Sequence, residues 1–210
     1  MNAPSETRSY LPRADRRERL LDAALDVVAE SGAASLSLRS VAERAGVAHR
    51  VVSYAFGSKT ELVAALLRRE SQRTLASVWA TPLRDESLPA AVRAALAAYA
   101  RDLVARPAAH AAVAELTAAA RGADRIAVAE EAALARRAIA DRLDEWCALT
   151  GARLSVPREL VATVLLICAD GLAAWQTTAP EAGPDAVLDT LSAGFAHLQV
   201  TSPATRDPAA

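Results

Sequence analysis

The chain has 210 residues, of which 52% are hydrophobic and 23% charged, and its formal net charge is −1. It contains 53 alanines but only 8 glycines and 8 aromatic side chains (three Trp, three Tyr, two Phe). This usage is typical of packed helices and disfavours β-sandwiches, β-barrels and collagen-like repeats. The longest run without a charged side chain, 190–205, has 16 residues and is rich in polar ones, so we expect no membrane span.

The first residues lack the apolar segment of a secretory signal. Cys147 and Cys168 lie in apolar segments without the spacing of metal ligands. We therefore expect a cytoplasmic protein with two buried thiols and with no metal and no cofactor.

Charge is distributed unevenly along the chain. Residues 1–73 carry 12 basic and 9 acidic side chains, whereas 74–210 carry 12 basic and 16 acidic ones. A basic first third suggests a polyanionic partner, although a small solvated face gives the same count.

Three helices are predicted after a polar N-terminal arm at 1–12, which we expect to be flexible. The first covers 13–31 and ends before Gly32. Two short helices follow, over 38–45 and 48–55, and the first of these is capped by a serine and closed by a glycine. Propensity alone leaves an alternative for the second short segment, because its valines and aromatic residues also suit a strand.

A long helix over 58–80 should connect this group to a helical body. Further apolar periodic segments are interrupted by Pro and Gly. They predict helices over 88–105, 108–120, 124–150, 157–178 and 185–199, followed by a flexible tail at 201–210.

Two short helices joined by a glycine turn and preceded by a longer helix form a helix-turn-helix, whose second short helix enters the DNA major groove. The segment 20–67 resembles the DNA-binding region of the tetracycline-repressor (TetR) family of bacterial regulators. The framework VAERAGV, the corner FGSK and the pair EL that follows are the specific parts of this resemblance. It implies an all-α fold, with a helix-turn-helix domain at 13–62 joined by the long helix to an effector-binding and dimerisation domain at 63–200.

Several residues of this region suit contacts with DNA. Ser37 can cap its helix and offer its hydroxyl to a phosphate, and Arg39 can reach a guanine edge. Lys59, the only lysine of the chain, falls in the first turn of the long helix, where a phosphate is favoured. The resemblance implies further contacts from the exposed side of the recognition helix: His49, Arg50, Val51, Ser53 and Tyr54.

This helix departs from the family pattern at three positions. Ala48 stands where Ser or Thr is usual, and it removes a helix cap worth about 1 kcal/mol. Ser53 replaces the usual Tyr and has a shorter reach, so Tyr54 could take over part of its phosphate contact. Ala55 stands where His is common.

The segment 157–178 is apolar on more than one face, unlike a helix at a protein surface. With the last helix it suits a two-fold interface of four helices, which the resemblance also implies. The alternative is that both helices lie inside the monomer. The candidate interface residues are Val164, Cys168, Gly171, Leu172, Trp175, Leu188, Leu191 and Phe195.

The alanine-rich middle helices enclose the effector pocket in this family. The pocket candidates are polar or large side chains on helical segments, and for each the alternative is an ordinary core or surface position. They are Trp79, Tyr99, His110, Glu115, Trp146, Cys147 and Gln176.

These features predict a homodimeric regulator of transcription. It is most simply a repressor that binds an inverted repeat in double-stranded DNA and is released by a small, mainly apolar effector. One alternative is a constitutive dimeric DNA-binding protein without an effector. The other is an all-helical enzyme, for which the sequence offers no phosphate-binding loop, nucleophile elbow or HExxH motif.

Overall fold

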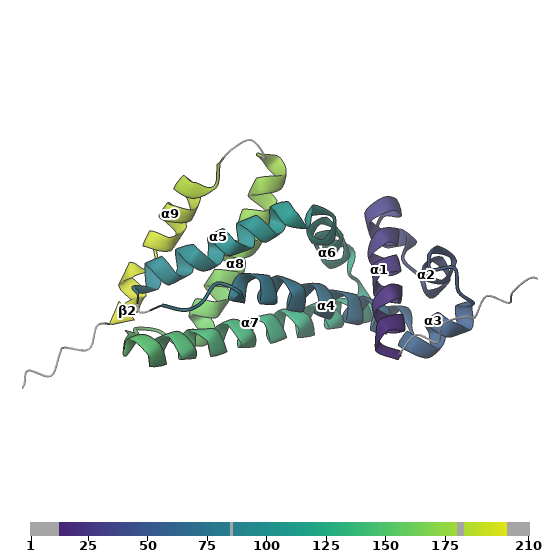
Figure 1. Ribbon diagram of the computed structural model, residues 1–210, viewed down its shortest axis with the longest axis horizontal. Coiled ribbons are helices and arrows are strands. Elements are labelled where there is room, and N and C mark those ends of the chain that lie inside the picture. The colour runs from purple at the N-terminus through teal and green to yellow at the C-terminus, as the bar shows by residue number, and fades with distance from the viewer. Residues whose placement is uncertain (1–12, 85, 180–182, 201–210) are drawn as a thin grey trace, which may run out of the picture. The chain divides into compact units, whose positions relative to one another are not determined.

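The computed structural model describes residues 13–84, 86–179 and 183–200, so the expected arm 1–12 and tail 201–210 lie outside the described residues. The described part is almost entirely α-helical, which confirms the all-α fold (Figure 1). It forms two compact units. The N-terminal unit comprises the described residues up to Leu67 together with Ala111–Ala127, and the body unit comprises Arg68–His110 and the described residues from Val128 onward.

The N-terminal unit begins with a three-helix arrangement, which confirms the predicted helix-turn-helix (Figure 1). Its elements are α1 (Arg13–Ser31), the short 3-10 helix η1 (Ala33–Ser35), α2 (Leu38–Arg44), α3 (His49–Phe56) and the start of α4 (Lys59–Trp79). Apolar residues at helical spacing on these helices are buried together and form the core of the unit. The most deeply buried of them are Leu20, Ala24, Val28, Leu36, Val41, Val52, Phe56, Leu62 and Leu66.

A second stretch of the sequence completes this unit, which differs from the expected boundary at residue 62. The stretch spans the end of α6 (Pro107–Ala119) and the start of α7 (Gly122–Thr150). The Ala33 N–H donates to Glu115 Oε1 at 2.7 Å. The Thr60 hydroxyl donates to Asp124 Oδ1 at 2.8 Å. These long-range polar contacts place 111–127 with the N-terminal helices, although the sequence put the whole stretch in the body.

The body unit is built around α5 (Leu88–Ala105), which packs against α8 (Arg158–Thr178) and α9 (Asp185–Ala193). Trp146 of α7 is 1% exposed, and its indole N–H donates to the Glu86 carbonyl at 3.2 Å. Large apolar side chains from these helices and from the turn after α9 form the core. They include Leu88, Val92, Leu96, Leu143, Trp146, Val161, Leu172, Leu188 and Phe195.

The prediction of a helix over 185–199 is wrong at its C-terminal end. α9 stops at Ala193, with Gly194 as its C-cap. A 3-10 turn η2 (Ala196–Leu198) and a short strand β2 (Gln199–Val200) follow, and β2 pairs antiparallel with β1 (Arg153–Leu154). The apolar spacing of the last residues matches a helix, but main-chain pairing with a distant segment overrides it.

α8 is long and apolar enough, by length and composition alone, to cross a membrane. A single helix of this kind is weak evidence for a membrane protein, because core helices of soluble proteins meet the same criteria. One side of α8 buries Val161 and Leu172 in the core, and other positions leave Leu160 and Ile167 52% and 63% exposed. The predicted apolar character on more than one face is thus confirmed.

Candidate nucleic-acid interface

Local hydrogen bonds fix both the start of α2 and the turn between α2 and α3. Ser37 caps α2, since its Oγ accepts from the Ser40 N–H at 3.0 Å while Ser40 Oγ accepts from the Ser37 N–H at 2.9 Å. Gly46 adopts a φ of 65°, a conformation that favours glycine. The following residue, Val47, donates its N–H to the Ala42 carbonyl at 3.0 Å. This geometry sets the direction in which α3 leaves the turn.

α3 is two-sided. Val52 and Phe56 are 0% and 2% exposed and pack in the core, whereas Tyr54 is 81% exposed. His49 and Arg50 are also exposed, and Val51 and Ser53 are half-buried. The Ser53 hydroxyl lies 3.3 Å from His49 Nδ1. A helix with one buried and one polar, exposed side can lie against a partner surface such as a DNA groove.

Ion pairs hold α2 on α1. Arg44 of α2 donates to Glu30 at 2.6 Å through Nη1 and to Asp26 at 3.3 Å through Nε. The hydrogen bond from Arg44 lowers the pKa of the Glu30 carboxyl below its ordinary value. All three side chains are largely exposed, so these pairs orient α2 more than they stabilise it.

The remaining predicted DNA contacts flank the helix-turn-helix. Arg39 lies on α2 with its side chain 81% exposed and pairs with Glu43 at 2.9 Å. This weak surface pair leaves the guanidinium able to exchange partners. Lys59 is the first residue of α4 and is exposed. The preceding Ser58 accepts the Glu61 N–H at 3.1 Å through its hydroxyl.

Comparison with known proteins agrees with this geometry. Residues 20–66, which include α2, the turn and α3, match the family model described as bacterial regulatory proteins of the tetR family. Residues 20–66 therefore carry a DNA-binding region of the TetR type.

Relatives and solved TetR-like structures extend this result. The HTH-type transcriptional regulator BetI of Burkholderia thailandensis is 37% identical over 72 residues, which are 34% of this chain and 35% of BetI. The chain therefore spans about a third of the length of that relative. A transcriptional regulator of Rhodococcus sp. Rha1 has a TM-score of 0.62 at 28% identity, over 84% of this chain and 91% of that one. The multidrug binding protein EbrR, solved with imidazole, has a TM-score of 0.63 at 23% identity, over 91% of this chain and 98% of EbrR.

The departures from the TetR pattern have visible structural consequences. Ala48 is the N-cap of α3 and makes no side-chain capping bond. Ser53 directs its short hydroxyl to His49 within the same helix. At the third position, the main-chain carbonyl of Ala55 accepts a hydrogen bond from Arg17 of α1 at 2.6 Å, a bond that does not depend on the side chain at 55. The C-terminal end of α3 thus has a side-chain partner that its N-terminal end lacks.

The pocket candidates are distributed over the two compact units. Glu115 belongs to the N-terminal unit, where it accepts the Ala33 N–H. Trp146 is a buried core residue, and Cys147 packs against the same core. Trp79 and Gln176 are half-buried.

Tyr99 and His110, two of these candidates, contact each other. Their rings meet edge to face, with centroids 5.6 Å apart. Burial, followed by the negative charges of Asp170 and Asp102, raises the pKa of Tyr99 to about 12.

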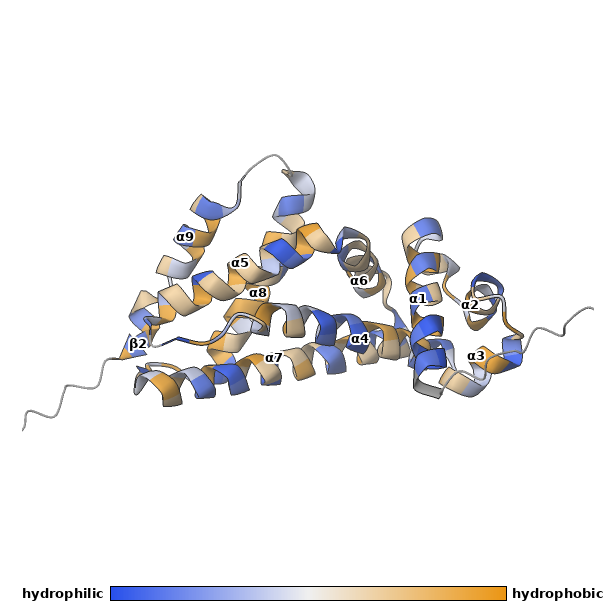
Figure 2. Ribbon diagram, viewed as in Figure 1, coloured by the Kyte–Doolittle hydropathy of each residue, from blue (hydrophilic) through white to orange (hydrophobic). Residues whose placement is uncertain are grey.

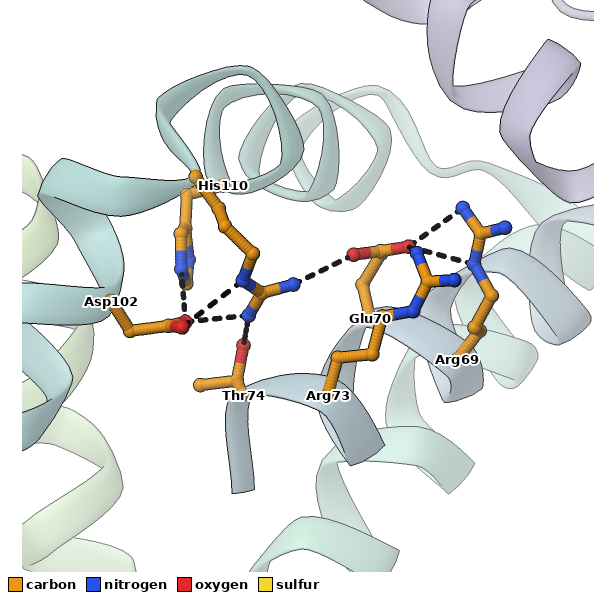
Figure 3. A network of polar contacts seen from close by, with 7 residues as sticks. Arg69, Glu70, Arg73, Thr74, Asp102 and His110 are labelled. Atoms are coloured by element: carbon orange, nitrogen blue, oxygen red, sulfur yellow. Dashed lines mark hydrogen bonds and ion pairs between the residues drawn. The ribbon is translucent and has the colours of Figure 1, made fainter. Parts of the chain in front are cut away.

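A network of charged and polar side chains, which the sequence did not predict, includes His110 of this pair (Figure 3). Arg106 is at its centre: it donates to Glu70 Oε2 at 3.0 Å, to Thr74 Oγ1 at 2.7 Å and to Asp102 Oδ1 at 3.0 Å. His110 Nε2 lies 2.8 Å from Asp102 Oδ2. Glu70 and Asp102 are 3% and 5% exposed, so two buried carboxylates share one guanidinium.

Two arginines of α4 complete this network. Arg69 Nη2 lies 2.7 Å from Glu70 Oε1, and Arg73 Nη1 lies 3.3 Å from the same atom. Figure 2 shows this charged part of α4 as a blue band. The one signal in the sequence was the i, i+4 spacing of Asp102 and Arg106, since helical periodicity otherwise assigns charged residues to solvent.

Opposing effects set the pKa of Asp102. Burial alone would raise it, but hydrogen bonds from Arg106, His110 and Ser77 outweigh burial and hold the pKa at about 2. The Asp102 carboxylate in turn raises the pKa of Arg106. The buried carboxylate is therefore charged at neutral pH.

The candidate interface residues divide into two sets. Leu172, Leu188 and Phe195 are 2%, 1% and 3% exposed and belong to the body core, which favours the interior alternative at these positions. The other set is at least partly accessible: Val164, Cys168, Gly171, Trp175 and Leu191. Two residues that we did not predict, Leu160 and Ile167, share a helical stripe with Val164 and Gly171 at positions i, i+4, i+7 and i+11 of α8.

Within the described ranges, no group of three or more His, Cys, Asp or Glu side chains could hold a metal ion. Cys147 and Cys168 are free thiols and only partly buried, which differs from the expectation that both are buried. Burial raises the pKa of each thiol.

Proposed function

We propose that this chain is a DNA-binding regulator of transcription that reads the major groove with α3. The observation that carries this proposal is the two-sidedness of α3. Its core side fixes the helix through Val52 and Phe56, and its other side exposes Tyr54, His49 and Arg50. Such a regulator works in the cytoplasm, and we propose no enzymatic activity for it.

Different side chains have different roles in this proposal. Arg39 and Arg50 read base edges, because a guanidinium can donate two hydrogen bonds to guanine, and Val51 contacts a thymine methyl. Ser37, Ser53 and Lys59 bind phosphates and set the register. His49 and Tyr54 contribute to the exposed reading side of α3.

Selection of bound sequences from random duplexes, followed by titration of variants, tests this assignment. Arg50→Ala should cost about 1 to 3 kcal/mol at a contacted guanine and relax the sequence preference there. Lys59→Ala should weaken all sequences alike and reduce the salt slope by about one. Failure to enrich any sequence, with no affinity for duplex DNA at low salt, would refute DNA binding.

We further propose that the protein acts as a homodimer on an inverted repeat. The exposed apolar stripe of α8 supports this: Leu160, Val164 and Ile167 are 52%, 36% and 63% exposed. An apolar stripe of this kind favours burial against a partner surface, and a two-fold axis would bring two copies of α8 together. Two-fold symmetry of the protein requires two-fold symmetry in its site.

The finer proposal is a repressor released by a small molecule. The observation that supports it is the edge-to-face contact between the rings of Tyr99 and His110 within the body unit. The crystal structure of EbrR, a multidrug binding protein, is a complex with imidazole, and at 23% identity this supports only the ability of the fold to hold a small molecule. The mainly apolar effector stays a prediction, and Asp102 and Arg106 add polar groups beside the candidate residues.

The measurement for this step is operator affinity with and without molecules found by thermal-shift screening. An effector should weaken operator binding about 5- to 150-fold, and by linkage the operator must weaken effector binding equally. If every tight binder leaves operator affinity unchanged, the constitutive alternative holds.

A further inference from the structure

Arg17, near the start of α1, contacts the C-terminal end of α3 in two ways. Its Nη1 donates to the Ala55 carbonyl at 2.6 Å. Its guanidinium carbon lies 4.4 Å from the centroid of the Phe56 ring. One side chain of α1 thus makes a main-chain hydrogen bond and a cation–π contact with consecutive residues of α3.

The physical importance of these contacts follows from the shortness of α3, which has eight residues. The last carbonyls of a helix have no partner within the helix, and they carry partial negative charge that a cation stabilises. At the other end, Ala48 supplies no side-chain cap. The last turn is closed by the Gly57 N–H, which donates to the Ser53 carbonyl at 2.8 Å.

The end that Arg17 holds is also the end nearest to an exposed reading side chain. Tyr54 directly precedes Ala55, and Phe56 anchors the same turn in the core at 2% exposure. A small rotation of this turn changes the direction of every exposed side chain on a helix of two turns. Reading of base edges depends on such directions, whereas a general attraction to phosphates does not.

We propose that Arg17 is a positioning residue for sequence recognition: it fixes the C-terminal end of α3 and contacts neither a base nor a phosphate itself. The proposal rests on the proposed DNA-binding function. It gives a specific role to one arginine of α1, a helix whose basic first turns would otherwise be read as a general phosphate-binding surface.

The variants Arg17→Ala and Arg17→Lys test this role, with Arg19→Ala as the control. Arg19 is exposed and lies on the same helix, so its removal changes the net charge of α1 equally. Affinities are measured for the selected operator and for a scrambled duplex over a range of salt concentrations. Thermal unfolding of each variant reports whether it folds.

Arg17→Ala should lower the ratio of operator to scrambled affinity about 5- to 30-fold relative to Arg19→Ala. The slope of log affinity against log salt should be the same for both variants, since neither removes a phosphate contact in this proposal. Arg17→Lys should give an intermediate ratio, because an ammonium keeps a donor but lacks the planar group that stacks on Phe56. A slope reduced by about one in Arg17→Ala alone, with an unchanged ratio, would show a phosphate contact and overturn the proposal.

Hydrogen exchange without DNA separates this proposal from the proposed function. The Gly57 amide, which closes the last turn of α3, should exchange faster in Arg17→Ala than in the unmodified protein and stay unchanged in Arg19→Ala. Unchanged exchange at this amide in Arg17→Ala would refute the positioning role. If the unmodified protein binds no DNA, the proposed DNA-binding function is refuted. Hydrogen exchange at the Gly57 amide still shows whether Arg17 holds the end of α3.

Discussion

Replacing Arg106 with Met removes the guanidinium that joins Glu70, Thr74 and Asp102 (Figure 3). The Met side chain is similar in length but has no donor. Two carboxylates that are 3% and 5% exposed then lose a charged partner. Glu70 keeps Arg69 and Arg73, and Asp102 keeps His110, so the loss is partial at each carboxylate.

The pKa of Asp102 gives a scale for the expected loss. Its ordinary value is 3.8 and its value in the folded protein is about 2, a difference that corresponds to roughly 2 kcal/mol of stabilisation at neutral pH. Breaking a buried ion pair by removing one partner costs about 3 to 5 kcal/mol when no other partner remains. Because other partners remain here, we expect Arg106→Met to lower the free energy of unfolding by about 2 to 4 kcal/mol.

The loss should depend on pH in one direction. Since the pKa of Asp102 is lowered in the folded protein, its contribution is complete above its ordinary pKa and disappears as the pH falls from about 4 to about 2. In Arg106→Met the pKa of Asp102 rises, so protonation costs the variant less. The difference in stability between the two proteins should therefore shrink over this pH range.

Urea unfolding followed by far-UV circular dichroism, at several pH values and at fixed protein concentration, measures this difference. Arg93→Met is the matched control, because Arg93 also bridges two carboxylates, Asp185 and Asp189, but on an exposed surface. Its unfolding midpoint should barely move, since solvent screens such pairs. A loss below about 1 kcal/mol in Arg106→Met, or a loss equal at every pH, would refute the reasoning.

Three further predictions concern separate parts of the chain. Ile167→Glu should convert the proposed dimer to monomer, as measured by sedimentation. Val104→Glu is the control, because Val104 is also an exposed apolar residue (74% against 63% for Ile167), and this variant should stay dimeric. If both variants are dimeric, the α8 interface is contradicted. Glu115→Ala should cost about 1 to 3 kcal/mol in urea unfolding because the buried Ala33 N–H loses its acceptor, whereas Glu115→Gln keeps an acceptor and should recover most of it. Gly46→Ala should cost about 1 to 2 kcal/mol by backbone strain alone, because φ is 65° and no atom lies within 4 Å of the added Cβ; an unchanged unfolding midpoint would show that the turn adapts.

Local signals predicted the N-terminal helices well. The serine cap at 37 and the glycines at 32 and 46 fixed helix ends to within one or two residues. The segment 48–55 was harder, since its valines suit a strand, and the helix prediction rested on the motif. Burial of Val52 and Phe56 against α1 and α2 explains why tertiary packing overrides propensity there.

Long-range interactions explain what the sequence could not predict. The end of α9 and the pairing of β1 with β2 depend on main-chain bonds between residues far apart in the sequence. The same holds for the buried carboxylates: nothing in the spacing of Glu70 indicates that Arg106 lies opposite. Leu172 and Leu188 were apolar at helical spacing, and spacing alone does not distinguish a core from an interface.

The course of three helices bears on how an effector could act on DNA binding. α4, α6 and α7 each contribute residues to both compact units. In α4 and α6, two residues that bond to the shared network lie close to the point where the helix passes from one unit to the other: Glu70 is two residues after the change at Arg68, and His110 directly precedes the change at Ala111. In the N-terminal unit, Glu115 of α6 bonds to the turn after α1.

A change in the body that shifts α4 or α6 is therefore carried along continuous helices, and packed helices move as units with few intermediate positions. In the proposed regulator, coupling between effector and DNA then requires only that the effector prefer one arrangement of these helices, and the size of that preference limits the response.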